Sequence, residues 1–149
     1  MTVRVTAPLA GRVLPLTEVP DAVFAEQMLG AGLAIEPGAG VVDVVAPVAG
    51  RLAKLHPHAF VVVTADGAGV LVHLGIDTVG LDDVFTVRVS EGDEVAAGDP
   101  VAAMDSDRVR SRGLSPITPV VLMEAEPGST VRGADGAVAP GDPLFSWTG

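Results

Sequence analysis

A phrase that occurs twice constrains the fold of this chain more than any other feature. The chain opens with VTAPLAGRVLPL, and the same pattern returns as VVAPVAGRLAKL, with Ala7 and Ala46 at equivalent places. Each copy is a strand that enters a Pro turn and leaves through Gly, which is the pattern of a hairpin corner. A second pair of phrases, VAAGDPV and VAPGDPL, shares a Gly-Asp-Pro turn. The repeats predict two similar halves that pack on each other, although Gly and Pro turns also resemble one another in any Val-rich sheet protein.

Short apolar runs predict a chain made of strands. Each run is rich in Val, Leu or Phe and is bounded by Gly, Pro or Asp. Helical patterning is limited to 19–28, which Pro20 and Asp21 introduce, and to 102–113, which Gly113 ends. We therefore predict an all-β fold, an antiparallel β-sandwich or flattened barrel with internal pseudo-duplication and at most short helical turns. The predicted strands are 3–5, 11–14, 32–35, 41–45, 51–55, 60–64, 69–74, 84–89, 101–103, 120–123, 137–138 and 144–147.

Length and composition are those of one folded unit. The chain has 149 residues, of which 48% are hydrophobic and 19% charged, so it is able to bury a core and does not have the composition of a disordered tail. Its 18 Gly and 12 Pro are spread along the chain and do not gather in a linker. We expect a single domain over residues 1–149.

The charge and the absence of cysteine exclude several classes of function. A net charge of −10 argues against nucleic acid and against an anionic membrane surface, because both attract clustered Lys and Arg, and it suits a basic protein partner. With no Cys, the chain has neither disulfides, thiolate metal ligands nor a Cys nucleophile. The remaining chemistry must come from other side chains.

No segment resembles a secretion signal or a membrane span. The start MTVRVTAPLA lacks a basic region followed by an apolar stretch. The longest charge-free runs, 55–65 and 113–123, are too short for a spanning helix, which takes about 20 apolar residues. We expect a cytoplasmic protein without direct membrane insertion.

The three histidines of the chain lie close together in sequence, in LHPHAFVVVTADGAGVLVHLGID. Asp66-Gly67 is a hairpin signal between two apolar strands, and it would bring His58 back alongside His73. The two rings could then face each other across an antiparallel pair. For His56 alone, an ordinary hydrogen-bonded or exposed residue is the expectation.

Alternation along the second strand of this hairpin decides which face carries the histidine. Val70, Val72 and Leu74 form one apolar face. Leu71 and His73 lie on the other face. We therefore predict that His73 does not point into the main core.

Two neutral imidazoles can together perform phosphoryl transfer. One ring nitrogen can attack phosphorus while the second ring donates an N–H to the phosphoryl oxygens. The reaction needs mostly positioning and charge stabilisation. The chain has no G-x-x-x-x-G-K-[ST] loop, so it would receive a phosphoryl group from a donor other than ATP.

Two other classes of function share fragments of this pattern. H-x-H and H-x-x-x-D together resemble the ligand set of lysostaphin-like zinc endopeptidases, in which His58, His73 and Asp77 would hold zinc and leave a position for water. The order of the two elements is reversed here, and that family acts on cell-wall peptide. A lipoyl- or biotinyl-type carrier would need a Lys at a hairpin tip, and the sole Lys, Lys54, has no such turn.

Five phrases resemble, in order, a known family. VPDAVFAEQMLGAGLAIEP, VAPVAGRLAKLHPHAFVV, GVLVHLGIDTVGL, EGDEVAAGDP and SPITPVV are similar to the glucose-family enzyme IIA component of the bacterial phosphoenolpyruvate-dependent sugar phosphotransferase system. The similarity runs from about residue 7 to residue 145. HLGIDTV, together with HAF at the right separation, is the most specific part.

The resemblance implies a phosphocarrier with an all-β fold. Such a protein accepts a phosphoryl group from the phosphocarrier protein HPr and passes it to the IIB domain of a IIB/IIC sugar permease. By motif position, His73 is the phospho-acceptor, through its Nε2, and His58 steadies the phosphoryl oxygens. No metal or cofactor is implied. The permease determines the sugar, and the sequence does not specify the regulatory partners of the carrier.

The resemblance also implies a docking surface. Asp77 and Asp21 match acidic positions that meet a basic partner, and Asp77 supports the acceptor histidine. Apolar residues around the histidines match positions that dock the partner, with plain core packing as the alternative. These residues are Val23, Phe24, Met28 and Leu71.

One position departs from the family pattern. Family members commonly have a Thr two residues before the supporting histidine, where its hydroxyl can orient the ring. Here that residue is His56, followed by Pro57. His56 either replaces the hydroxyl as an orienting group or is merely exposed.

Overall fold

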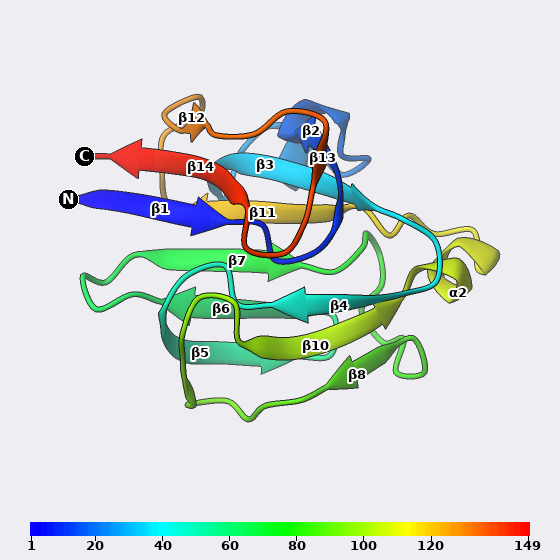
Figure 1. Cartoon of the computed structure of the whole chain (residues 1–149). Coiled ribbons are helices and arrows are strands. Elements are labelled where there is room, and N and C mark those ends of the chain that lie inside the picture. The colour runs from blue at the N-terminus through cyan, green and yellow to red at the C-terminus, as the bar shows by residue number, and fades with distance from the viewer.

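A computed structural model describes residues 1–149, and its regular secondary structure consists mostly of antiparallel strands (Figure 1). The strands are β1 Thr2–Thr6, β2 Gly11–Pro15, β3 Gly30–Pro37, β4 Val41–Val45, β5 Gly50–His56, β6 Ala59–Val63, β7 Gly69–His73, β8 Phe85–Val87, β9 Glu94–Val95, β10 Pro100–Asp105, β11 Thr118–Met123, β12 Val131–Arg132, β13 Ala137–Val138 and β14 Pro143–Thr148. Three short helical turns complete the chain: η1 Leu16–Glu18, α1 Ala22–Ala25 and α2 Ser106–Ser111. The predicted all-β fold is confirmed.

The predicted elements correspond closely to the observed ones, and the differences lie mainly at the ends of strands. Strands β9 and β12 were not predicted; each has two residues and pairs with one longer strand, β5 or β14. Strands β3, β10 and β11 are longer than the predicted 32–35, 101–103 and 120–123. Strand β8 is shorter than the predicted 84–89. Both helices are also shorter than their patterns, and neither is long and apolar enough to cross a membrane.

The three sheets are related by a pseudo-two-fold symmetry. The largest sheet has eight strands in the order β13-β2-β3-β11-β7-β6-β5-β9, and the two smaller sheets are β1-β14-β12 and β4-β10-β8. When the strand order of the large sheet is read from its other end and the two small sheets are interchanged, β1 corresponds to β4, β2 to β5 and β3 to β6. One half is the continuous segment β4 to β10, and the other consists of β1 to β3 with β11 to β14. The predicted pseudo-duplication is therefore present, with one half inserted into the other.

The repeated Pro turns bind each other where the two halves meet. The backbone N–H of Thr6 donates to the carbonyl of Pro47 at 2.9 Å, and the N–H of Val45 donates to the carbonyl of Pro8 at 2.7 Å. Thr6 and Val45 hold equivalent places in the two phrases, as do Pro8 and Pro47. The reciprocal hydrogen bonds explain why the phrase occurs twice.

The repeated Gly-Asp-Pro turns are equivalent in the same way. The side chain of Asp99 accepts from the N–H of Ala96, and the side chain of Asp142 accepts from the N–H of Ala139, both at 2.8 Å. An Asp side chain that bonds to a nearby N–H fixes a tight turn without strand partners. Each turn then closes its half against the neighbouring Pro turn.

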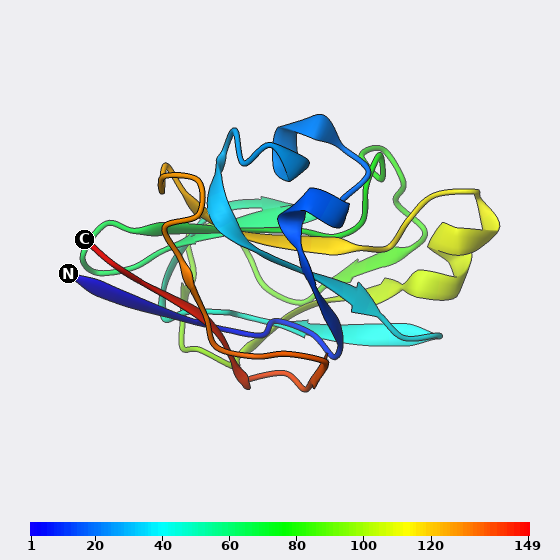
Figure 2. The same cartoon turned by 90° about the horizontal axis from the view of Figure 1, so that it is seen from above.

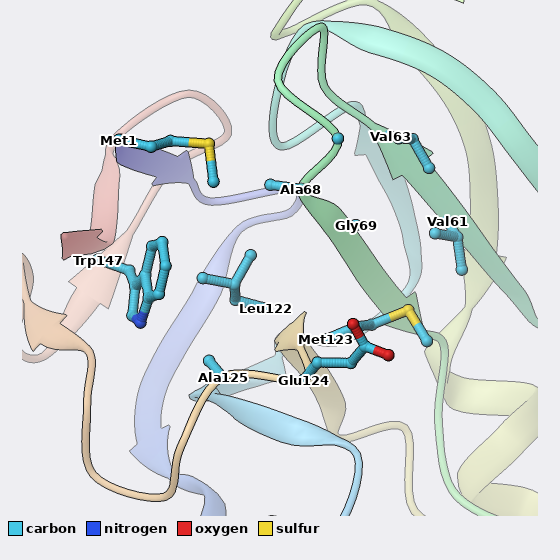
Figure 3. A pocket seen from close by; sticks show the side chains of 11 residues that line it. Met1, Val61, Val63, Ala68, Gly69, Leu122, Met123, Glu124, Ala125 and Trp147 are labelled. Atoms are coloured by element: carbon cyan, nitrogen blue, oxygen red, sulfur yellow. The ribbon is translucent and has the colours of Figure 1, made fainter. Parts of the chain in front are cut away.

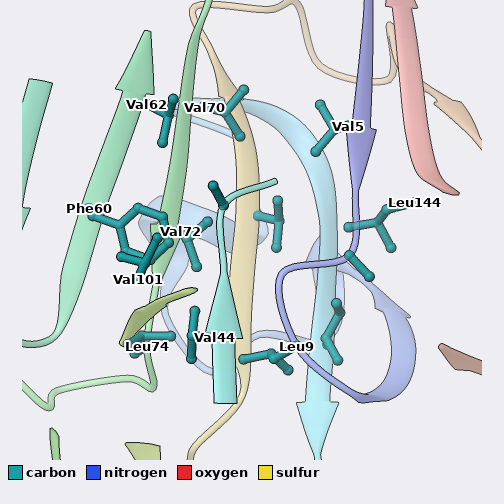
Figure 4. Close-up of a cluster of buried hydrophobic side chains, with 14 of the residues drawn as sticks. Val5, Leu9, Val44, Phe60, Val62, Val70, Val72, Leu74, Val101 and Leu144 are labelled. Atoms are coloured by element: carbon teal, nitrogen blue, oxygen red, sulfur yellow. The ribbon is translucent and has the colours of Figure 1, made fainter. Parts of the chain in front are cut away.

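Alternation along the strands separates two apolar clusters. Val62 on β6 and Val72 on β7 point inward, towards Val44 on β4 and Val101 on β10, within a main core of 32 residues (Figure 4). On the other face of the large sheet, a second cluster of 9 residues lies under η1 and α1. Figure 2 shows these turns (dark blue) above the sheet. The outer face is therefore partly covered, and the histidine pair lies at the border of this cover.

We expect Phe60→Ala to lower the free energy of unfolding by about 3–5 kcal/mol. Phe60 is 1% exposed at the centre of the main core, so truncation removes its packing and leaves a cavity. Urea denaturation of wild type and variant measures the difference. Val131→Ala, at a strand position that is 66% exposed, is the control and should change stability by less than about 0.5 kcal/mol. Equal effects at the two sites would contradict the assignment of the core.

Candidate histidine site

The register of β6 and β7 brings two histidines together. Ala59 lies opposite His73, and the N–H of Leu74 donates to the carbonyl of His58 at 2.6 Å. The ring centroids of His58 and His73 lie 5.2 Å apart, with an angle of 78° between the ring planes. The predicted hairpin, which turns at Asp66 and Gly67, therefore places the edge of one imidazole against the other.

His56 joins this pair from the preceding strand. It ends β5 opposite Ala59, so Pro57 and His58 form the two-residue turn between β5 and β6. The ring of His56 stacks on that of His58, with centroids 5.8 Å apart and planes inclined by 29°. His56 is exposed, whereas the other two histidines are half-buried.

Phe24 also packs against the ring of His73. Its ring centroid lies 5.1 Å from that of the histidine, and the side chain is 5% exposed. Phe24 belongs to α1, which begins at Asp21, whose carboxylate caps the helix by accepting from the N–H of Val23 at 2.9 Å. Four rings therefore follow one another from α1 to the end of β5.

A backbone hydrogen bond fixes the tautomer of His73. Its Nδ1 lies 2.6 Å from the carbonyl oxygen of Gly75, and because a carbonyl only accepts, Nδ1 carries the proton. In the neutral ring, Nε2 then keeps its lone pair. Gly75 was not among the predicted site residues, because it acts through its backbone carbonyl.

The loop after β7 holds this carbonyl rigidly. Gly75 has a φ of +79°, and a Cβ there would lie 2.6 Å from Cγ2 of Thr78. Thr78 is fully buried, and its hydroxyl donates to the carbonyl of Leu74 at 2.6 Å. The N–H of Ile76 also donates to the carbonyl of Ser115 at 2.9 Å. The HLGIDT segment is thus a constrained loop that orients the histidine ring.

Burial keeps both facing imidazoles in the neutral form. It lowers the pKa of His73, while the bond to Gly75 and the carboxylates of Asp21 and Asp77 act in the opposite direction and offset part of the effect. Burial also lowers the pKa of His58, and the neighbouring imidazoles of His73 and His56 lower it further. A neutral His73 offers a nucleophilic nitrogen, and a neutral His58 still offers one N–H.

The structure buries two of the four residues expected in the apolar docking rim. Phe24 and Leu71 are 5% and 9% exposed, because both pack in the second cluster under η1 and α1. Val23 and Met28 are 39% and 69% exposed and form the accessible part of the rim. Val79, in the loop after β7, is another exposed apolar side chain, at 70%, that was not among the predicted site residues.

The zinc ligand set proposed from H-x-H and H-x-x-x-D is not assembled. No group of three or more His, Cys, Asp or Glu side chains is arranged to hold a metal ion. Asp77 is exposed in the loop after β7. The structure therefore gives no support to the hydrolase alternative.

An apolar pocket lies at the other end of β7. Its volume is about 410 Å³, and Figure 3 shows Leu122, Met123 and Trp147 among its lining side chains. Gly69, at the start of β7, also lines it, whereas His73 ends that strand. The pocket is therefore separate from the histidine site.

Comparison with known proteins agrees with this geometry. Residues 3–127 match the model of a family described as phosphoenolpyruvate-dependent sugar phosphotransferase system, EIIA 1. The structure is also similar to that of glucose permease IIA from Mycoplasma capricolum, with a TM-score of 0.86 and 36% sequence identity over 98% of this chain and 96% of that chain. The chain therefore belongs to the EIIA 1 family of the phosphoenolpyruvate-dependent sugar phosphotransferase system and is a phosphocarrier component of that system.

Proposed function

We propose that this chain accepts a phosphoryl group from HPr on Nε2 of His73 and passes it to the IIB domain of a sugar permease. The observation that carries the proposal is the hydrogen bond from Nδ1 of His73 to Gly75, because it leaves the Nε2 lone pair free. Membership of the family and the similarity to a glucose permease IIA support the same role. Residues 1–149 would act as one phosphocarrier domain in the cytoplasm.

The transfer requires few groups. The Nε2 lone pair forms a bond to phosphorus while the bond to the donor breaks, and the donor keeps that electron pair. The proton on Nδ1 stays in its bond to Gly75, so no base is needed to free the nucleophile. His58, edge-on to the acceptor ring at 5.2 Å between centroids, is placed to donate an N–H to the phosphoryl oxygens.

The residues around His58 and His73 favour a protein partner whose contact surface is basic with an apolar centre. Asp21 is half-buried and Asp77 exposed beside His73, and the chain as a whole carries a net charge of −10. Val23 and Met28 add exposed apolar area next to these carboxylates. Apolar contact surrounded by complementary charge gives both affinity and orientation.

Substitution of each histidine should separate their roles. We expect His73→Gln to prevent phosphorylation, because the acceptor nitrogen is lost. His58→Gln should still become phosphorylated but should transfer the group onward about 10²-fold more slowly, because an electrostatic donor is lost. The measurement is mass spectrometry under non-acidic conditions after mixing with phosphoenolpyruvate, enzyme I, HPr and Mg²⁺, followed by addition of the IIB domain.

The controls concern the phosphoryl group itself. In wild type, the mass should rise by one phosphate, and acid should remove it, as it does from phosphohistidine. No gain of mass in wild type would overturn the proposal. A normal gain in His73→Gln would move the acceptor to another residue.

Both imidazoles should titrate below the ordinary histidine value of 6.5. Burial disfavours the charged rings, so the folded protein binds these protons less readily than the unfolded chain. Their contribution to stability is therefore present above pH 6.5 and is lost as the pH falls towards the folded-state values. NMR titration of the ring Cε1 protons measures the midpoints, which should return to about 6.5 in urea. A midpoint at or above 6.5 for His73 in the folded protein would contradict its neutral, buried state.

Removing the charge of Asp21 should weaken association with HPr. Asp21→Asn keeps an acceptor for the N–H of Val23, so α1 keeps its cap. We expect KM for HPr to rise up to about fivefold at low salt, with kcat little changed. Asp66→Asn, at the exposed far end of the β6–β7 hairpin, is the matched control. The docking role would be excluded if both variants behaved alike.

A further inference from the structure

The ring of His58 has no hydrogen bond to hold it. His73 is fixed through its bond to Gly75, whereas no side-chain hydrogen bond reaches the imidazole of His58. His58 also lies in a two-residue turn, where a side chain has few neighbours. Its orientation against His73 must therefore come from contacts between rings.

His56 supplies the only flat contact in this group. Its ring plane is inclined by 29° to that of His58, whereas His73 meets His58 edge-on at 78°. His58 therefore has one stacked and one T-shaped ring contact, and together they limit rotation of its side chain. Stacked and edge-to-face aromatic pairs both have preferred geometries, so the combination defines one orientation.

We propose that His56 is a positioning residue of the phosphoryl-transfer site, whose ring packs flat on His58 and holds that imidazole edge-on to His73. The expected effect of His56 on phosphoryl transfer rests on the proposed function. Its effect on the orientation of the His58 ring can be measured in the free protein. In this chain the ring of His56 would orient His58, whereas family members commonly have a Thr hydroxyl at this position. An aromatic contact can hold a ring without occupying either of its nitrogens.

The same contact acts on the charge of His58. Its pKa is lowered by burial and by the imidazoles of His73 and His56. The nearby carboxylates do not shift the pKa of His58. Asp21 and Asp77 raise the pKa of His73, and Glu91 accepts a hydrogen bond from the backbone N–H of Leu55 on β5 at 3.0 Å. His58 therefore faces only other imidazoles, and its neutral form is favoured.

Neutrality of His58 matters for onward transfer. An imidazolium beside the phosphoryl group would stabilise the phosphorylated carrier itself and slow release to the next acceptor. Loss of His56 should therefore slow onward transfer most at the acidic end of the pH range. It should leave KM for HPr unchanged, because we expect His56 to act through its contact with His58.

Three substitutions test the assignment. His56→Gln removes the ring, His56→Thr introduces the residue common in the family, and His56→Phe keeps a flat ring without a charge. Lys54→Gln is the control, because Lys54 is exposed on the same strand two residues earlier. All are compared by kcat for transfer to the IIB domain between pH 6 and 8, and by NMR contacts between the ring protons of residues 58 and 73 in the free protein.

We expect kcat for His56→Gln to fall about tenfold, with weakened NMR contacts between the two rings. His56→Phe should restore those contacts and most of the rate at pH 8, and His56→Thr should lie between these variants. Lys54→Gln should match wild type. Unchanged ring contacts and an unchanged pH profile in His56→Gln would overturn the proposal. If no form of the protein accepts phosphate, the proposed function fails, and the NMR contacts alone decide the role of His56.

Discussion

The hydrogen-bonded register between β6 and β7 is the constraint on which the site depends. It sets Ala59 opposite His73 and joins the backbone of His58 to that of Leu74. Because side chains alternate between the faces of a strand, a slip of one residue would turn His73 into the main core and Val72 out of it. The apolar face therefore enforces the position of the reactive face, and burial of the core stabilises the geometry of the imidazoles.

Much of this arrangement could be predicted from the sequence because it depends on local signals. The Asp66-Gly67 turn gives the hairpin, and the two-residue period assigns His73 to the face opposite Val72. The repeated phrases predict two halves, because two copies of the same strand-turn-strand phrase indicate two similar structural units. Neighbouring residues alone cannot show how the halves connect: the pairing of β3 with β11 and β7 with β11 depends on contacts between distant segments.

The parts that could not be predicted depend on contacts between distant elements. The family resemblance implied that Phe24 and Leu71 belong to a docking rim, with core packing as the alternative. In the structure, η1 and α1 fold over the outer face of the sheet and both residues are buried. The role of Gly75 depends on its backbone carbonyl, which no side-chain pattern reveals. Strands β9 and β12 exist only where a longer strand offers them an edge.

A reversible carrier needs an acceptor nitrogen that is reactive but not too basic. Burial lowers the pKa of His73, which favours the neutral ring. In the proposed transfer it would also weaken the bond to phosphorus, because a less basic nitrogen leaves more readily. The bond to Gly75 and the carboxylates of Asp21 and Asp77 oppose this effect and keep the nitrogen nucleophilic. The same loop therefore orients the ring and moderates its basicity, as the proposed transfer of a phosphoryl group in both directions requires.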